Sequence, residues 1–82
     1  MIEVLFFARL REALGLSHLT LEIAESITVA QLKEQLAARG APWQQALGQC
    51  QVLAAVNQEL ADDGAIVRPG DEVALFPPAT GG

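Results

Sequence analysis

The sequence predicts an α+β domain in which a mixed sheet of about five strands carries one main helix on one face. Two segments are predicted to be central strands of the sheet, Val4–Ala8 and Glu72–Phe76. Each has apolar residues at both odd and even positions, which is typical of a strand covered on both faces. A third observation predicts the helix, since Thr28 and Gln31 have the spacing of a capping box. We therefore expect the first and last strands to be central, with the helix packed across them.

The first third of the chain predicts two strands joined by a short polar piece. Val4–Ala8 is rich in β-branched and aromatic residues, and Leu10–Gly15 is the connecting piece. In Leu19–Ile23 apolar residues alternate with polar ones, which predicts a half-buried strand paired with the first as a hairpin. Phe6 and Phe7 cannot point to the same side of a strand, so we expect one in the core and the other on a sheet face that awaits a partner.

The main helix is predicted over Val29–Arg39. Its capping box is flanked by Ile27 and Leu32 as a hydrophobic staple, and Gly40 is placed for a left-handed C-terminal cap. Pro42 then suits the first position of a second, short helix that carries Trp43 and Leu47.

The rest of the chain predicts three more strands. Val52–Val56 is followed by the turn residues Asn57 and Gln58 and by a brief edge strand around Glu59 and Leu60. The segment Asp62–Gly70 is turn-rich, and the turn at 68–71 launches the last strand, Glu72–Phe76. Strand, strand, helix, strand, short strand, strand, with the terminal strands parallel and a right-handed crossover, is the β-grasp roll of ubiquitin-like folds. We assign residues 1–76 to this domain and residues 77–82 to an extended tail.

Composition and charge exclude several classes of function. The 82 residues are 51% hydrophobic and 18% charged with a net charge of −5, which indicates one small folded domain and argues against nucleic-acid binding. An acidic surface favours a partner with a basic face. Cys50 and His18 are the single cysteine and histidine, so we predict no disulfide and no metal site. No segment is apolar over a membrane-spanning length, and we expect a cytoplasmic protein with no membrane partner.

The C-terminal segment Pro77–Gly82 is the candidate functional site. Two prolines end the strand and favour extended backbone, so the tail could hold its carboxylate up to about 20 Å from the sheet. Gly81 and Gly82 have no Cβ atoms, which lets the backbone enter a narrow channel and exposes the terminal carbonyl carbon. Because an ionised carboxylate is a poor electrophile, another enzyme would have to activate it with ATP as an acyl-adenylate. The alternative is an inert, flexible chain end.

Three blocks of sequence resemble one family over nearly the whole chain. VLFFARLRE (4–12), AAVNQEL (54–60) and above all GDEVALFPPATGG (70–82) are similar to the small subunits of molybdopterin synthase, which are sulfur carrier proteins. The resemblance implies that a ubiquitin-activator-like adenylyltransferase adenylates Gly82 and that a sulfur-donating enzyme supplies the sulfur of a C-terminal thiocarboxylate. The tail would then enter the synthase large subunit, in an expected heterotetramer, and donate sulfur to a cyclic pterin monophosphate to form the dithiolene of molybdopterin. It implies no permanently bound cofactor, with ATP consumed by the activating enzyme.

The same resemblance assigns roles to particular residues. Gly82 would carry the sulfur and Gly81 would give access to it. The remaining tail residues would line the passage of the tail: Pro77, Pro78, Ala79 and Thr80. Partner contacts would fall on Arg11, Leu60 and Phe76, and on Phe7 if that ring faces outward. The chain itself would not be catalytic.

Two related functions and one unrelated function stay open at this point. A sulfur carrier of the thiamine pathway also ends in two glycines, although the diproline and the opening VLFFARLRE favour the molybdopterin type. A ubiquitin-like modifier would use the same activation to join Gly82 to lysine amines of target proteins. A plain interaction module would leave the tail without chemistry. The sequence does not assign a role to Cys50. It also does not identify the source of the sulfur or indicate whether the isolated chain self-associates.

Overall fold

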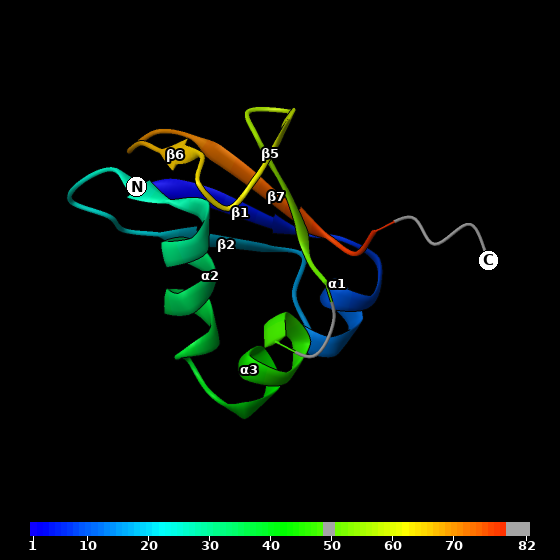
Figure 1. The fold of residues 1–82 in the computed structure, drawn as a ribbon. Helices are drawn as coiled ribbons and strands as arrows, with labels where there is room; N and C mark the ends of the chain where they lie inside the picture. The colour runs from blue at the N-terminus through cyan, green and yellow to red at the C-terminus, as the bar shows by residue number, and fades with distance from the viewer. Residues whose placement is uncertain (49–50, 79–82) are drawn as a thin grey trace.

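The structure is a computed structural model, and it describes residues 1–48 and 51–78. Figure 1 shows one sheet with the helices gathered against one of its sides. None of the helices in the described ranges is long and apolar enough to cross a lipid bilayer. The elements follow in the order β1 (Ile2–Phe6), α1 (Ala8–Leu14), β2 (His18–Leu21), β3 (Ile27–Thr28), α2 (Val29–Ala37), α3 (Ala41–Gly48), β4 (Leu53–Val56), β5 (Glu59–Ala61), β6 (Ile66–Val67) and β7 (Glu72–Phe76).

The main sheet has the strand order β2-β1-β7-β4-β5, with a separate pair β3-β6. The terminal strands β1 and β7 lie side by side and parallel, and every other neighbouring pair is antiparallel. Both terminal strands are interior, β5 is at an edge, and the connection from β1 to β7 contains the helices. This is the β-grasp order that the sequence predicts.

The hydrophobic core lies between the sheet and the helices. Alternate residues of β1 and β7 point into it: Ile2, Val4 and Phe6 from β1, and Val73 and Leu75 from β7, are all at most 1% exposed. Leu10 of α1 and three residues of α2 complete the helical side of this core, namely Val29, Leu32 and Leu36.

Within residues 1–48 and 51–78, no second layer covers the opposite face of the sheet. This corrects the prediction that the two central strands are covered on both faces. Leu5, Ala74 and Phe76 point away from the helices and are only half-buried. All three helices pack on the other side, so apolar residues at both parities here mark a surface that stays open to solvent. We call this surface the open sheet face and define it by Leu5, Leu53, Ala55, Leu60, Ala74 and Phe76.

The piece between the first two strands is a helix, α1, where a short polar connection was predicted. Strand β1 starts and ends two residues before the predicted Val4–Ala8, because Phe7 is already the N-cap of α1. Leu10 is buried, and Gly15 ends the helix in the left-handed conformation (φ 75°), its N–H donating to the carbonyl of Arg11 at 2.9 Å. Seven residues contain too few apolar positions to give a clear helical period, which is why the pattern did not reveal this helix.

The main helix α2 confirms the predicted start. The Thr28 hydroxyl accepts from the Gln31 N–H at 3.1 Å, and the Gln31 side chain accepts from the Thr28 N–H at 2.9 Å. The end differs: α2 stops at Ala37, and the cap is Ala38 in a right-handed conformation rather than Gly40. The last turn tightens, since the Arg39 N–H donates to the Leu36 carbonyl, and Gly40 (φ 151°) falls in the connection to the next helix.

The predicted short helix that carries Trp43 and Leu47 is confirmed as α3, although it begins at Ala41, so Pro42 is its second residue rather than its first. Its Trp43 is half-buried, meets Phe6 edge-to-face at a centroid distance of 5.6 Å, and lies under the Arg39 guanidinium at 5.0 Å. These contacts fix α3 against α2 and the end of β1.

The C-terminal half follows the prediction except for one strand. Asn57 and Gln58 both have positive φ (51° and 72°), the geometry of a tight hairpin turn between β4 and β5. The turn at 68–71 closes with a bond of 3.0 Å from the Asp71 N–H to the Arg68 carbonyl. The turn-rich segment 62–70 contains a strand that was not predicted, β6, which pairs with β3. The sequence did not reveal it because a strand of two residues is too short to show alternation. In the N-terminal half, strand β2 ends at Leu21 rather than at the predicted Ile23. Ile23 is buried, but it lies beyond the end of the strand.

Candidate functional site at the base of the C-terminal tail

The tail begins at the end of an interior strand. Strand β7 ends at Phe76, which is paired with Leu53 of β4, and on its other side the Phe7 N–H donates to the Leu75 carbonyl at 3.2 Å. Pro77 and Pro78 follow outside the strand and are half-buried. Neither proline has a backbone N–H to donate to a neighbouring strand, so the hydrogen-bonded pairing of β7 stops where the sequence predicts. The four residues predicted to carry or flank the reactive end lie outside the described residues: Ala79, Thr80, Gly81 and Gly82.

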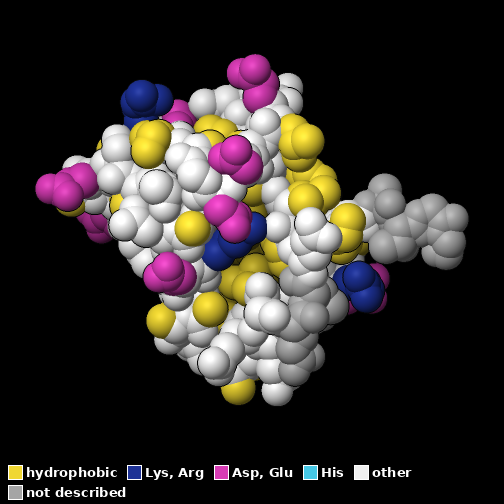
Figure 2. Space-filling view, viewed as in Figure 1, with side chains coloured by type: hydrophobic (Ala, Val, Ile, Leu, Met, Phe, Trp, Pro, Cys, Tyr) yellow, Lys and Arg dark blue, Asp and Glu magenta, His cyan; other side chains and the backbone are white. Residues whose placement is uncertain are grey.

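The open sheet face brings together predicted partner residues from distant parts of the sequence. Ala55 is directly opposite both Leu60 and Ala74, and Ala74 is directly opposite Leu5, so these side chains form one row across four strands. The pair Phe76 and Leu53 continues this surface toward the tail. Figure 2 shows hydrophobic side chains at the surface beside the point where the chain passes into the grey segment.

Two residues of this region are large, apolar and well exposed. Leu60 is 75% exposed on the edge strand β5, and Phe7 is 45% exposed. Phe7 has extended backbone, so it continues the alternation of β1 and points to the side opposite Phe6, beside Phe76. Of the two neighbouring rings, Phe6 is therefore the core residue and Phe7 the outward one. Exposed apolar residues of this size on one surface are typical of a protein interface.

The same face carries an acidic margin at the far end from the tail. Glu3 and Glu72 are directly opposite each other on β1 and β7. The Glu3 carboxylate lies 3.1 Å from Nε2 of His18, which is exposed on the edge strand β2. An apolar surface bordered by carboxylates fits a partner whose apolar patch is bordered by Lys or Arg.

The two arginines near the tail have different settings. Arg11, predicted as a partner contact, is exposed on α1 and so lies in the helical layer rather than in the sheet. Arg9 was not singled out from the sequence, although it lines a cleft beside Pro77 on the helical side. The signal for Arg9 was the helix itself, because ARLREAL followed by glycine is a run of good helix formers with a C-terminal cap. Cys50 lies outside the described residues.

A hydrogen-bond network holds the start of β7, the strand whose other end is the base of the tail. The Asn57 side chain accepts from the Glu72 N–H at 3.0 Å and donates to the Asp71 carboxylate at 3.1 Å, and that carboxylate also accepts from the Arg68 N–H at 2.8 Å. The Arg68 N–H, and then the Asn57 amide, lower the pKa of Asp71 below its ordinary value of 3.8 because both donate to the charged form. The β4–β5 turn is thus tied to the turn that launches β7.

This arrangement places an apolar, partly exposed surface next to the base of the C-terminal segment. Within residues 1–48 and 51–78, no group of three or more His, Cys, Asp or Glu side chains is placed to hold a metal ion. The described residues instead supply an apolar face, a bordering set of carboxylates, and a strand that delivers the tail from the middle of the sheet.

The fold and the site define a ubiquitin-like β-grasp protein with an apolar sheet face at the base of its C-terminal tail. The profile of the ThiS family matches residues 4–82, and the chain belongs to this family. The match includes the four tail residues that lie outside the described structure.

Two relatives align with the whole chain. The molybdopterin synthase sulfur carrier subunit of Escherichia coli (strain K12) is 46% identical over 82 residues, and that of Haemophilus influenzae is 43% identical over 82 residues. In both cases the alignment covers 100% of this chain and 100% of the relative.

Solved structures share the fold. A putative molybdopterin converting factor, subunit 1, from Pyrococcus furiosus superposes with a TM-score of 0.79 at 25% identity, covering 95% of this chain and 97% of that chain. The crystal structure of the small archaeal modifier protein 1 of Haloferax volcanii superposes with a TM-score of 0.76 at 26% identity, with the same shares covered.

Proposed function

We propose that this chain is the sulfur carrier subunit of a molybdopterin synthase and that Gly82 carries the sulfur. The observation that carries the proposal is the pair of full-length relatives with that name, at 43% and 46% identity. The site supports it, because an interior strand leads directly into the tail and an apolar face lies beside that strand end. A subunit of this kind has a partner, and we assign the open sheet face to the synthase large subunit, within a heterotetramer.

The chemistry takes place at the terminal carboxyl group. An α-carboxylate has a pKa of about 3.5 and is ionised at neutral pH, so its carbon resists attack by a nucleophile. An adenylyltransferase transfers AMP from ATP to this carboxylate and releases pyrophosphate. Sulfide-level sulfur from a sulfur-donating enzyme then attacks the carbonyl carbon of the acyl-adenylate, AMP departs as the leaving group, and a thiocarboxylate remains on Gly82. ATP is consumed by the activating enzyme, and the chain itself holds no cofactor.

The remaining predicted residues serve access and docking. Gly81 leaves the reactive carbonyl unobstructed, and Ala79, Thr80 and the two prolines pass through the channel of the large subunit, where the sulfur goes to a cyclic pterin monophosphate. Phe7, Leu60 and Phe76 bind the partner through the open sheet face, and Arg11 contacts it from α1. The isolated chain turns over no substrate. The cytoplasmic location expected from the sequence stays a prediction.

The intact mass of the protein, isolated from a cell that makes molybdenum cofactor, tests this proposal. We expect free chains in which one oxygen is replaced by one sulfur. Deleting Gly82 should abolish both this species and the formation of molybdopterin, while thermal unfolding stays nearly unchanged. Adding one alanine before Met1 is the matched control and should leave both intact. Full pterin sulfuration by the chain without Gly82 would contradict the proposal.

A second candidate is a ubiquitin-like modifier, which the likeness to the small archaeal modifier protein favours at 26% identity. A modifier would appear in the same mass measurement as larger adducts, with Gly82 in an isopeptide bond to lysine. The thiamine-pathway carrier also uses a thiocarboxylate. It is separated by mixing the thiocarboxylated chain with the cyclic pterin precursor and a synthase large subunit, since a thiamine-type carrier would form no dithiolene.

A further inference from the structure

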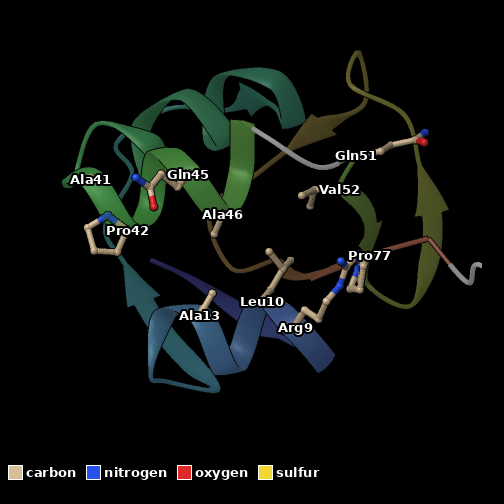
Figure 3. A pocket seen from close by; sticks show the side chains of 10 residues that line it. All are labelled: Arg9, Leu10, Ala13, Ala41, Pro42, Gln45, Ala46, Gln51, Val52 and Pro77. Atoms are coloured by element: carbon tan, nitrogen blue, oxygen red, sulfur yellow. The ribbon is translucent and has the colours of Figure 1, made fainter.

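A cleft of about 400 Å³ lies on the helical side of the molecule, away from the open sheet face. Figure 3 shows that α1 and α3 form its walls, with Leu10 and Val52 pointing into it. The wall residues Ala13 and Ala46 have short side chains, so the cleft is wide enough to admit a side chain from another molecule. Its volume is in the range of sites that bind small molecules or anchor residues.

The cleft adjoins the base of the tail. Pro77, the first residue after β7, is one of its lining residues, and in Figure 3 the side chain of Arg9 extends toward it. Any protein that grips the tail from Pro77 onward therefore passes along the mouth of this cleft. The cleft and the open sheet face lie on opposite sides of the end of β7.

Arg9 gives the cleft a single charge. Among the described lining residues it is the charged one, and the others are apolar, apart from two glutamines. The salt bridges among the described residues are Glu3 with His18 and Lys33 with Asp63, so Arg9 forms no such pair there. The N-terminal end of a helix carries a partial positive charge, so a cation in the first turn does not stabilise the helix. The stability of α1 therefore does not explain an arginine at position 9. On a chain of net charge −5, this is a local positive site beside an apolar cavity.

We propose that the α1–α3 cleft is a second docking site for the synthase large subunit. The partner inserts an apolar side chain between Leu10 and Val52, and a neighbouring carboxylate of the partner pairs with Arg9. This inference rests on the proposed function, because the large subunit is the protein that receives the tail. Contacts on both sides of β7 would fix the direction in which the tail leaves, which one surface alone does not do.

The test measures the dissociation constant of the full chain and the purified large subunit by titration calorimetry. Arg9→Gln should weaken binding about fivefold and reduce its dependence on salt, as expected for the loss of one partly exposed ion pair. Ala13→Phe, which fills the cleft from an exposed position, should weaken binding tenfold or more. The matched controls are Arg68→Gln, which removes the same charge elsewhere, and Ala38→Phe, which adds the same ring outside the cleft. Both controls should bind like the original chain.

The outcomes separate this inference from the proposed function. If the unaltered chain binds the large subunit and donates sulfur, but Arg9→Gln and Ala13→Phe bind equally well, the second docking site is wrong and the proposed function stands. The inference also fails if the two variants slow only adenylation, which would assign the cleft to the activating enzyme. It fails equally if sedimentation shows that they abolish a self-association of the unaltered chain. If the unaltered chain neither binds nor donates sulfur, the proposed function itself is wrong.

Discussion

At the scale of single residues, the Asp71 carboxylate joins the β4–β5 turn to the turn that launches β7. Its two oxygens accept from the Arg68 N–H and from the Asn57 amide, and Asn57 in turn holds the N–H of Glu72 at the start of β7. All of these bonds to Asp71 favour its ionised form, which is why the pKa of Asp71 is lowered in the folded state. Because the folded state favours ionised Asp71, the stability of the fold depends on pH through this group.

The sign of this dependence gives a prediction. A carboxylate with a lower pKa in the folded state contributes stability that is complete above the unfolded pKa, 3.8 for Asp71, and is lost as pH falls through the folded pKa. We expect Asp71→Asn to be less stable than the original chain at about pH 7 and to lose less stability on acidification to about pH 3. Urea unfolding at the two pH values measures both differences. Equal losses in the two proteins would mean that Asp71 does not contribute in this way.

At the scale of elements, the sequence predicted those that have a local chemical signature. The capping box, the Asn57-Gln58 turn and the alternating strand near Leu19 each depend on neighbours in sequence, and each is found. The elements that it missed are short: α1 has seven residues, and β3 and β6 have two residues each. They form because packing and pairing complete them, through the burial of Leu10 and the ladder between β6 and β3. Such contacts between distant segments are not written in a local pattern.

The capping box yields the prediction for this scale. Thr28→Ala removes the acceptor of the Gln31 N–H and should cost about 1 kcal/mol of unfolding free energy. For a domain of this size, that loss lowers the unfolding temperature by about 4–8 °C. Thr28→Ser keeps the hydroxyl and is the matched control. Sulfur transfer should be unaffected, because Thr28 lies in the β3–α2 region, away from the tail base. A Thr28→Ala chain as stable as the serine variant would show that the cap is not a main determinant of α2.

At the scale of the whole molecule, the candidate site is assembled by topology. The parallel pairing of β1 with β7 brings Phe7 to the end of the ladder that leads to Phe76. The antiparallel pairing of β4 with β5 and β7 places Leu60 on the same face, in the neighbouring row with Ala55 and Ala74. The resemblance named these partner residues from the sequence, but only the register shows that they share a face. The α1–α3 cleft was not predicted, because one of its walls is the helix that the apolar pattern did not reveal.

The open sheet face therefore makes a prediction about assembly rather than stability. Leu60 is 75% exposed, so Leu60→Asp removes little buried area and should leave the unfolding temperature nearly unchanged. In the complex the same change would place a carboxylate against an apolar surface, and we expect binding to the large subunit to weaken tenfold or more. Ile66→Asp is the matched control, because Ile66 is also apolar and 45% exposed but belongs to the separate β3–β6 pair. Equal affinities for the two variants would remove Leu60 and its part of the open sheet face from the interface, since a charge on this face would then be tolerated as well as one outside it.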